Sequence, residues 1–328
     1  MIIDPTELKN RHAKRLAGMH DNKVYIGPEN VTVEITNACN IRCQFCVTEH
    51  APGNPAHFEK AHFLPLEKFR EIVNDSVQMK VNEITIVGSG EPTIHPSFRD
   101  MMKCVENQPL YVKLHTNATF PLDYCSDVLK VDHVIINLSA IDREHYINMT
   151  GKDLFNRVIA NIERLVSMRD TDKPGFKIEI AYIVNTVNFN QIPKMKELAV
   201  QLDVNTIDFR KMIVIEYNKE IIVPENLSPD LASIGQRTPP ACLNGWFYIL
   251  VMSGGNFSNC YMIPQLGFGD LNRYSLKQYW FSSHMDKIRL LGKYGHTQKK
   301  YKACLKCPSY DENIQRAQDL DALEENKV

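Results

Sequence analysis

Apolar, β-branched runs alternate with segments of helical period along the middle of the chain. The strand-like runs occupy residues 31–35, 83–87, 112–116, 134–138, 177–184 and 206–210, and the helix-like segments occupy residues 66–78, 98–106, 155–168 and 192–202. This alternation is typical of repeated βα units around a parallel sheet. Six units are too few for a closed eight-stranded barrel, so the sequence predicts an open α/β structure with its active site at the carboxyl ends of the strands.

Composition excludes several kinds of partner. The chain of 328 residues has 38 Lys and Arg against 39 Asp and Glu, so no net field attracts nucleic acid or an anionic membrane. The longest apolar run, residues 246–252, is far shorter than the roughly 20 residues of a membrane span. Residues 1–22 are polar and basic with no apolar signal segment, and we therefore expect a cytoplasmic protein.

Three cysteines stand close together in the run 37–46. Cys39, Cys43 and Cys46 have the spacing C-x3-C-x2-C. Soft thiolates suit iron–sulfur clusters, and a short loop lets three of them converge on three irons of a [4Fe–4S] cube. The fourth iron is then open to a small molecule, as at a catalytic metal site. The alternatives are a disulfide framework, unpaired thiols or zinc, and the spacing is a poor match to zinc.

The motifs around these cysteines carry a family resemblance. With Phe45 before the last cysteine and Gly88-Ser-Gly90-Glu91-Pro92 further along, the chain resembles the radical S-adenosylmethionine (SAM) superfamily. The resemblance implies a (β/α)6 partial TIM barrel, with the open iron chelating the amino and carboxylate groups of SAM. It also implies that an electron passed into the sulfonium releases a 5′-deoxyadenosyl radical, which removes a hydrogen atom from the substrate.

The resemblance also implies which residues hold SAM. They are Phe45, Gly88, Gly90, Glu91, Pro92, Asn117 and Ser139. The segment after the second strand is expected to bind the methionine amino group, because its glycines let the backbone approach a ligand closely. Asn117 and Ser139 end the next two strands and are expected at the carboxylate and ribose of SAM. Phe45 is expected to pack beside the adenine.

A second group of cysteines lies in the last third of the chain. Cys242, Cys260, Cys304 and Cys307 have the spacing C-x17-C-x43-C-x2-C, and four thiolates can close around a second [4Fe–4S] cluster or a structural zinc ion. The sequence predicts a β-hairpin at residues 246–259 and a helix at 276–291 beside them. This region resembles the auxiliary-cluster extension of the superfamily, called SPASM. With four cysteines there instead of seven, it resembles the shortened twitch form.

These features divide the chain into four predicted parts. Residues 1–30 form an N-terminal segment, 31–222 the radical SAM core domain, 223–310 the twitch or SPASM-like auxiliary-cluster domain, and 311–328 a polar tail. Four prolines between residues 223 and 242 suit a connector rather than a helix or a central strand.

The cysteine spacing is similar to that of the radical SAM dehydrogenases of aminocyclitol antibiotic biosynthesis. The resemblance implies oxidation of a carbon that bears a hydroxyl, with the auxiliary cluster as electron acceptor, and a flavodoxin or ferredoxin as reductant. We therefore predict an oxidoreductase acting on a small polar molecule. Epimerisation, peptide modification and, from another class, a non-catalytic zinc-binding protein remain alternatives.

Substrate contacts are predicted from position alone. Tyr182, Asn185, Arg210 and Met212 lie at or near the ends of the last two predicted strands. Arg210 is the candidate catalytic residue, because its guanidinium fork suits a hydroxyl, carboxylate or phosphate. Pairing of Arg210 with a neighbouring carboxylate is the alternative.

Overall fold

A single sheet of eight strands organises the protein. The computed structural model describes residues 3–46, 61–211, 239–260, 269–301, 304, 307 and 309–325. The strands follow the spatial order β6-β5-β4-β3-β2-β1-β7-β8. Their bounds are β1 (Asn30–Thr36), β2 (Glu83–Gly88), β3 (Tyr111–Thr116), β4 (His133–Asn137), β5 (Lys177–Val184), β6 (Thr206–Lys211), β7 (Tyr248–Val251) and β8 (Phe257–Ser258). All neighbours pair in parallel except β7 and β8, which are antiparallel.

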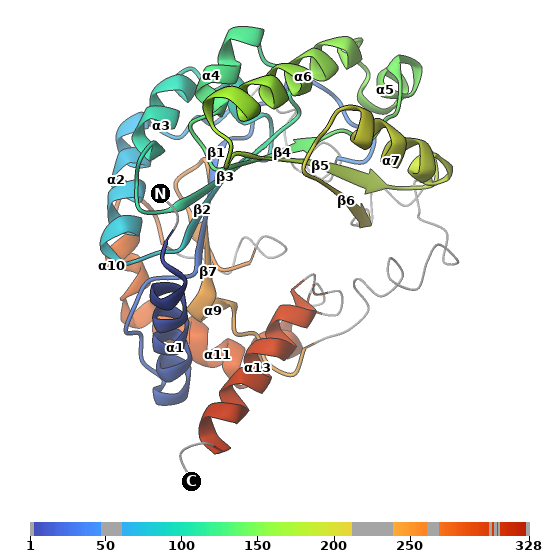
Figure 1. The fold of residues 1–328 in the computed structure, drawn as a ribbon. Helices are drawn as coiled ribbons and strands as arrows, with labels where there is room; N and C mark the ends of the chain where they lie inside the picture. The colour runs from blue at the N-terminus through green and yellow to red at the C-terminus, as the bar shows by residue number, and fades with distance from the viewer. Residues whose placement is uncertain are drawn as a thin grey trace.

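The sheet bends into an open arc with helices on its convex side (Figure 1). The helices are α1 (Pro5–Asp21), α2 (Leu66–Gln78), α3 (Phe98–Val105), α4 (Cys125–Val128), α5 (Arg143–Thr150), α6 (Phe155–Asp172), α7 (Ile192–Gln201), α9 (Asn244–Phe247), α10 (Leu276–Trp280), α11 (Ser283–Lys293), α12 (His296–Lys300) and α13 (Tyr310–Glu325). Three short 3-10 turns are η1 (Pro92–Ile94), η2 (Leu122–Tyr124) and η3 (Phe189–Gln191). The predicted partial barrel with its C-terminal extension is confirmed.

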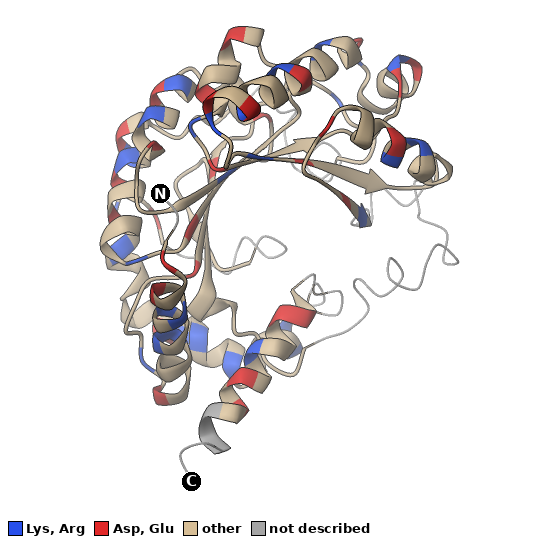
Figure 2. Ribbon diagram, in the orientation of Figure 1, with Lys and Arg blue, Asp and Glu red and all other residues tan. Residues whose placement is uncertain are grey.

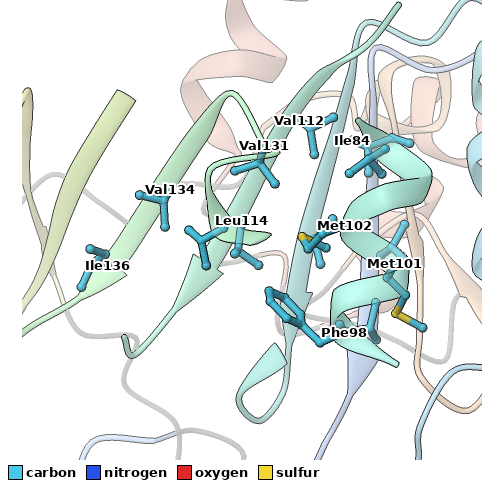
Figure 3. Close-up of a cluster of buried hydrophobic side chains, with 14 of the residues drawn as sticks. Ile84, Phe98, Met101, Met102, Val112, Leu114, Val131, Val134 and Ile136 are labelled. Carbon is cyan, nitrogen blue, oxygen red and sulfur yellow. The ribbon is translucent and has the colours of Figure 1, made fainter. Parts of the chain in front are cut away.

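Alternation along each strand produces the two faces of the arc. On β3, Val112 and Leu114 are buried under the helices, where Phe98 and Met102 of α3 pack against them (Figure 3). Successive side chains of a strand point to opposite faces, so the intervening residues line the concave wall. That wall is polar on the same strand, which supplies Tyr111, Lys113 and His115.

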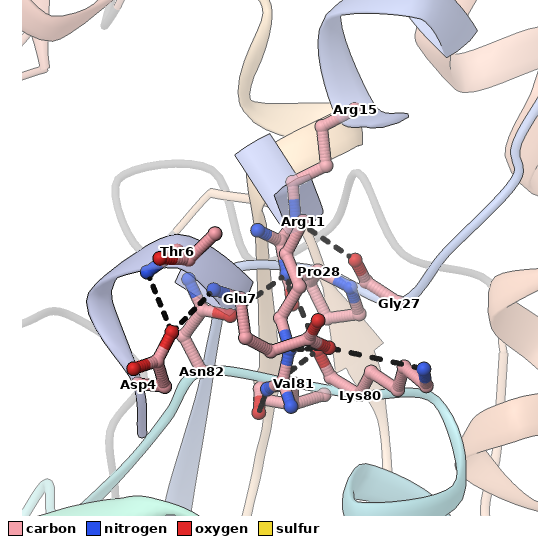
Figure 4. A network of polar contacts seen from close by, with 10 residues as sticks. All are labelled: Asp4, Thr6, Glu7, Arg11, Arg15, Gly27, Pro28, Lys80, Val81 and Asn82. Atoms are coloured by element: carbon pink, nitrogen blue, oxygen red, sulfur yellow. Dashed lines mark hydrogen bonds and ion pairs between the residues drawn. The ribbon is translucent and has the colours of Figure 1, made fainter. Parts of the chain in front are cut away.

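Helix α1 covers the amino-terminal end of the first strands. Arg15 is 2% exposed, and its guanidinium donates to the carbonyls of Gly27 (3.0 Å) and Pro28 (2.8 Å), just before β1. Arg11 donates to the carbonyl of Val81 (3.0 Å), before β2 (Figure 4). Burial lowers the pKa of Arg15 to about 10, so the guanidinium stays charged at neutral pH. These contacts leave the carboxyl ends of the strands as the functional edge.

The C-terminal part differs from the sequence prediction in three places. Trp246 belongs to α9, so the predicted hairpin is shorter, and its first strand continues the main sheet beside β1. The single helix predicted at 276–291 is two helices, because the hydroxyl of Ser282 accepts from the Met285 N–H (3.2 Å) and starts α11. The predicted polar tail is helix α13, whose Asn313 is 1% exposed and accepts from the Leu243 N–H (2.6 Å).

The boundary predicted at residues 222 and 223 lies outside the described residues, and the division into domains stays a proposal. No helix in the described ranges has the length and apolar character needed to cross a membrane.

Candidate active site

Two loops that the sequence separates lie against each other at the carboxyl ends of β1 and β2. The glycine loop (residues 88–92) hydrogen-bonds to the chain just before the cysteine loop (residues 39–46), since the Glu91 N–H donates to the Ala38 carbonyl (2.7 Å). A Cβ at Gly90 would lie 1.8 Å from the same carbonyl oxygen. Only glycine permits this approach, and the fold thereby brings the two motifs into one site.

The cysteine loop is also held from the side of α5. Its backbone N–H groups at Arg42 and Gln44 donate to the carbonyls of Thr150 (2.9 Å) and Met149 (3.0 Å). Cys39, Cys43 and Cys46 form no disulfide and are half-buried, as a cluster partly open to a ligand requires. Burial raises the pKa of the Cys39 thiol to about 12, a cost that bound iron would offset because the metal ligand is the thiolate.

Phe45 is half-buried in the turn before Cys46. Its place beside an adenine stays a prediction.

The carboxylate of Glu91 is directed into the protein. It is 2% exposed and accepts from the Thr93 hydroxyl (2.6 Å), the Thr116 hydroxyl (2.6 Å) and the Asn117 N–H (2.6 Å). Burial raises the pKa of Glu91, and the hydrogen bonds from Asn117, Thr116 and Thr93 oppose that shift. Glu91 therefore fixes the glycine loop against the end of β3.

A polar triangle joins the cysteine loop to the chain after β3. The Asn117 amide donates to the Asn40 side-chain oxygen (3.0 Å), Asn40 donates to the Thr119 hydroxyl (2.7 Å), and that hydroxyl donates to Asn117 (2.7 Å). Asn40 and Thr119 are not among the residues predicted from the sequence. Two features of the sequence could have indicated them: Asn40 is an amide between two cluster cysteines, and Thr119 is a hydroxyl just beyond the end of a strand.

Ser139 lies at the end of β4, as predicted, and is 7% exposed. Its hydroxyl oxygen accepts from the Ile183 N–H (2.9 Å) on β5. The hydroxyl hydrogen is left as a donor, so a contact with SAM stays a prediction.

The concave wall carries a charged cluster on β3 to β6. Arg210 donates to Glu179 (2.8 Å) and Asp208 (2.6 Å), and His133 Nε2 lies 3.4 Å from the other oxygen of Glu179. Burial, and next the positive charge of Arg210, lowers the pKa of His115 to about 4. His115 is consequently a neutral imidazole at physiological pH. Arg210 can contact a substrate only through the guanidinium N–H groups that are not bonded to Glu179 or Asp208.

The other strand-end candidates do not line this wall. Tyr182 is 0% exposed, packs edge-on against Phe209 and donates to the Asn188 carbonyl (2.9 Å), so its predicted place in the cavity is wrong. The side-chain oxygen of Asn185 accepts from the Val187 N–H (2.9 Å) and closes a turn. Met212 lies outside the described residues.

The second cysteine group converges where the hairpin, α11 and the chain before α13 meet. The Cys242 N–H donates to the Gly292 carbonyl (3.0 Å). The pKa of Cys242 is raised to about 12, first by burial and then by nearby charge on Cys260, Cys307 and Cys304. Four cysteines close enough to affect one another's pKa are the set of ligands that a [4Fe–4S] cluster binds.

No three His, Cys, Asp or Glu side chains in the described part of the chain approach closely enough to hold a single metal ion. A cube carries its irons at separate corners, so its cysteines stand farther apart than the ligands of one ion. The fit of both cysteine groups to clusters therefore rests on their donor chemistry and on the convergence of their loops.

An open βα barrel with three cysteines beside a glycine loop, followed by a region with four more cysteines, defines an iron–sulfur enzyme. The chain belongs to the radical SAM superfamily, whose family model matches residues 33–199. A second model, SPASM, described as an iron-sulfur cluster-binding domain, matches residues 242–308 and contains all four distal cysteines. The protein's cofactors are accordingly SAM, the [4Fe–4S] cluster that binds it, and an auxiliary cluster.

Sequence relatives match about half of the chain. The chain is 28% identical over 183 residues to a tungsten-containing aldehyde ferredoxin oxidoreductase cofactor-modifying protein of Pyrococcus furiosus, covering 53% of this chain and 48% of that one. It is 27% identical over 188 residues to a GTP 3′,8-cyclase of Chlorobaculum tepidum, covering 56% of this chain and 53% of that one. The matches thus span about half the length of these relatives.

Similarity in structure extends over nearly the whole chain. SuiB of Streptococcus suis bound to S-adenosylmethionine superimposes with a TM-score of 0.65 at 15% identity, covering 93% of this chain and 78% of that one. The anSMEcpe protein with bound AdoMet gives a TM-score of 0.58 at 14% identity, covering 92% of this chain and all of that one. At this identity, the likeness shows the fold alone.

Proposed function

We propose that the protein is a radical SAM oxidoreductase that oxidises a carbinol of a small polar substrate to a carbonyl. One observation supports this proposal most strongly: the concave face of the sheet is polar, and the hairpin beside the second cysteine group continues that same sheet. When bound, SAM and the two clusters supply a radical that removes a hydrogen atom and, at the second site, an acceptor for the electron that the substrate then releases. The substrate hydroxyl then loses its proton to a base, and the carbonyl is formed.

The concave wall suits a molecule rich in hydroxyl or charged groups. Arg210 pairs with Glu179 (2.8 Å) near the carboxyl end of β6, and deeper on the same face, toward the amino ends of β2 and β3, Lys113 pairs with Glu83 (2.8 Å). Hydrogen-bond donors and acceptors therefore stand side by side on this face. A polar substrate can hydrogen-bond to these side chains, so that none of them is buried without a partner when the substrate binds. The predicted catalytic role of Arg210 is proposed in this sense, as a group that orients the substrate.

The remaining cysteines favour oxidation over epimerisation. All nine cysteines lie in the described part of the chain, and seven belong to the two cluster groups. Of the other two, Cys104 lies on α3 and Cys125, 1% exposed, on α4, both packed with the core on the convex side. A radical epimerase that returns a hydrogen atom from a thiol needs that thiol on the concave side.

Peptide modification is the second candidate. It is favoured by the likeness to SuiB, which also has a structure bound to precursor peptide SuiA. Against it, the names of the sequence relatives point to a nucleotide and a cofactor. A cytoplasmic flavodoxin or ferredoxin is the proposed electron donor. Nucleic acid is not a proposed partner, because Lys and Arg alternate with Asp and Glu along the helices drawn in Figure 2.

The test begins with iron, sulfide and zinc content of the anaerobically reconstituted protein and with 5′-deoxyadenosine formation in dithionite and SAM. About eight irons per chain and formation of 5′-deoxyadenosine are expected. Aminocyclitols and sugars deuterated at their carbinol carbons, and a panel of short peptides, are then assayed for deuterium transfer into 5′-deoxyadenosine. Transfer from a carbinol with formation of a ketone supports the proposal, and transfer from peptides alone contradicts it.

The Cys304→Ala variant separates the two cluster sites. It is expected to lose about four irons and ketone formation while it still forms 5′-deoxyadenosine. Ketone formation at the wild-type rate without the second cluster would show that this cluster is not the electron acceptor.

A further inference from the structure

Glu34 lies on the concave face of β1 and is 6% exposed. One oxygen of its carboxylate accepts from the backbone N–H (3.2 Å) and the hydroxyl of Ser253. The other oxygen accepts from the hydroxyl of Ser89. A buried carboxylate with three donors in two directions is firmly placed, because both lone-pair regions are engaged.

The two serines belong to the two halves of the enzyme. Ser89 is the middle residue between Gly88 and Gly90 in the glycine loop, which lies against the cysteine loop. Ser253 begins the turn between β7 and β8, where the Gly255 N–H donates to the Met252 carbonyl (2.8 Å). β1 stands between β2 and β7 in the sheet, so Glu34 reaches both of their carboxyl ends.

From this turn the chain leads directly to the second cluster group. β8 ends at Ser258, whose hydroxyl donates to the Cys260 carbonyl (2.8 Å) and accepts from the Cys260 N–H (3.2 Å). Only β8 and Asn259 separate the turn from Cys260, so we expect a shift of the turn to reach this cysteine. A shift of the glycine loop moves Ser89 in the same way.

We propose that Glu34 is a positioning residue that couples SAM binding to the auxiliary-cluster domain, through Ser89 on one side and Ser253 on the other. The inference rests on the assignment of the two cluster sites and not on the identity of the substrate. Coupling between two sites is reciprocal. The Ser253 contact thus strengthens SAM binding, and bound SAM changes the reduction potential of the auxiliary cluster.

The test measures SAM dissociation constants on the reconstituted holoenzyme by equilibrium dialysis with radiolabelled SAM. Ser253→Ala, in the other domain, is expected to weaken SAM binding about five-fold, the lower end of typical coupling. In a Ser89→Ala background, the same change is expected to have no further effect, since the connection is already broken. Glu34→Ala should weaken SAM binding as well, and Glu34→Gln should restore part of it, because an amide can accept from Ser253 and donate to Ser89.

The matched control is Ser275→Ala. Ser275 caps α10 in the same domain and has no contact with Glu34, so its loss destabilises the domain without breaking the connection. SAM affinity of this variant should equal that of the wild type. If Ser275→Ala weakens SAM binding as much as Ser253→Ala, the effect is general loosening and the proposal is overturned.

The potential of the auxiliary cluster, followed by EPR during redox titration, gives an independent readout. In the wild type, SAM is expected to shift this potential, and in Ser89→Ala the shift should be lost. This arm also decides the question if Ser253→Ala does not fold.

Wild-type SAM affinity in Ser253→Ala, or additive effects of the two serine changes, overturns the coupling while leaving the proposed function intact. A wild-type protein that binds no SAM, or lacks the second cluster, overturns both.

Discussion

At the scale of single residues, the site depends on where a side chain is excluded. Gly90 has no room for a Cβ because the Ala38 carbonyl oxygen would lie 1.8 Å away. The sequence marked this glycine only through its motif. The contact that requires it joins residues far apart in the chain and is a tertiary one.

Gly90→Ala should separate the glycine loop from the cysteine loop, because backbone atoms on both sides must move. We expect SAM affinity to fall by tenfold or more, about 1.4 kcal/mol, measured by equilibrium dialysis. Gly175→Ala is the matched control, since a Cβ there meets nothing within 4 Å. Equal SAM binding by the two variants would contradict the packing of the loops.

His115 should make stability depend on pH. Its pKa is lowered to about 4 by burial, whereas an unfolded histidine titrates near 6.5. The unfolded chain therefore binds more protons between these values, and stability falls as pH drops from about 6.5 toward 4. Between pH 7.5 and 5.5, urea unfolding should show the wild type losing about 1 kcal/mol more than His115→Gln. An identical loss in both proteins would mean that His115 is not buried as a neutral ring.

At the scale of elements, the hydrophobic pattern predicted the six core strands and the helices α2, α3, α6 and α7, but neither α1 nor the helix caps. α2 and β5 begin and end where the apolar periodicity places them. The single helix predicted at 276–291 is wrong because apolar residues continue past Phe281, whereas α10 ends at Trp280 with Phe281 as its C-cap and Ser282 caps the start of α11. A serine inside a run of helical period can either continue the helix or cap the start of a new one, and only the tertiary structure decides which.

Ser282→Ala removes the hydroxyl that accepts the Met285 N–H at the start of α11. Loss of such a cap costs about 1 kcal/mol, measurable as a lower urea midpoint. The neighbouring Ser283→Ala should leave the midpoint unchanged, since Ser283 is exposed at the first helical position. If both variants unfold alike, the cap does not separate α10 from α11.

At the scale of the whole molecule, the cluster extension completes the barrel sheet. β7 pairs with β1 from Asn30↔Tyr248 to Val33↔Val251, covering an edge that the core alone would expose. Leu16 and Met19 of α1 pack against Trp246 and Phe247 of the same extension. The two regions therefore share both a sheet and a core.

Deletion of residues 239–328 should leave β1 as an open edge and expose the apolar face of α1. Open edges template association, so the truncated protein is expected to aggregate during size-exclusion chromatography. Deletion of residues 309–328 alone keeps β7 and β8 and should yield more monodisperse protein. A soluble, monodisperse 1–238 fragment would show that the core folds independently.

The sequence by itself determined the six parallel strands of the core, the two cysteine groups and the family. Each of these features follows from the spacing of nearby residues or from the hydrophobic period, and both can be recognised without knowing any tertiary contact. The tertiary structure alone decided that the hairpin joins β1, that Glu91 faces inward and that Arg210 is paired with Glu179 and Asp208. It also placed Glu34 between Ser89 and Ser253, because hydrogen bonds between residues distant in sequence follow from packing and have no local pattern.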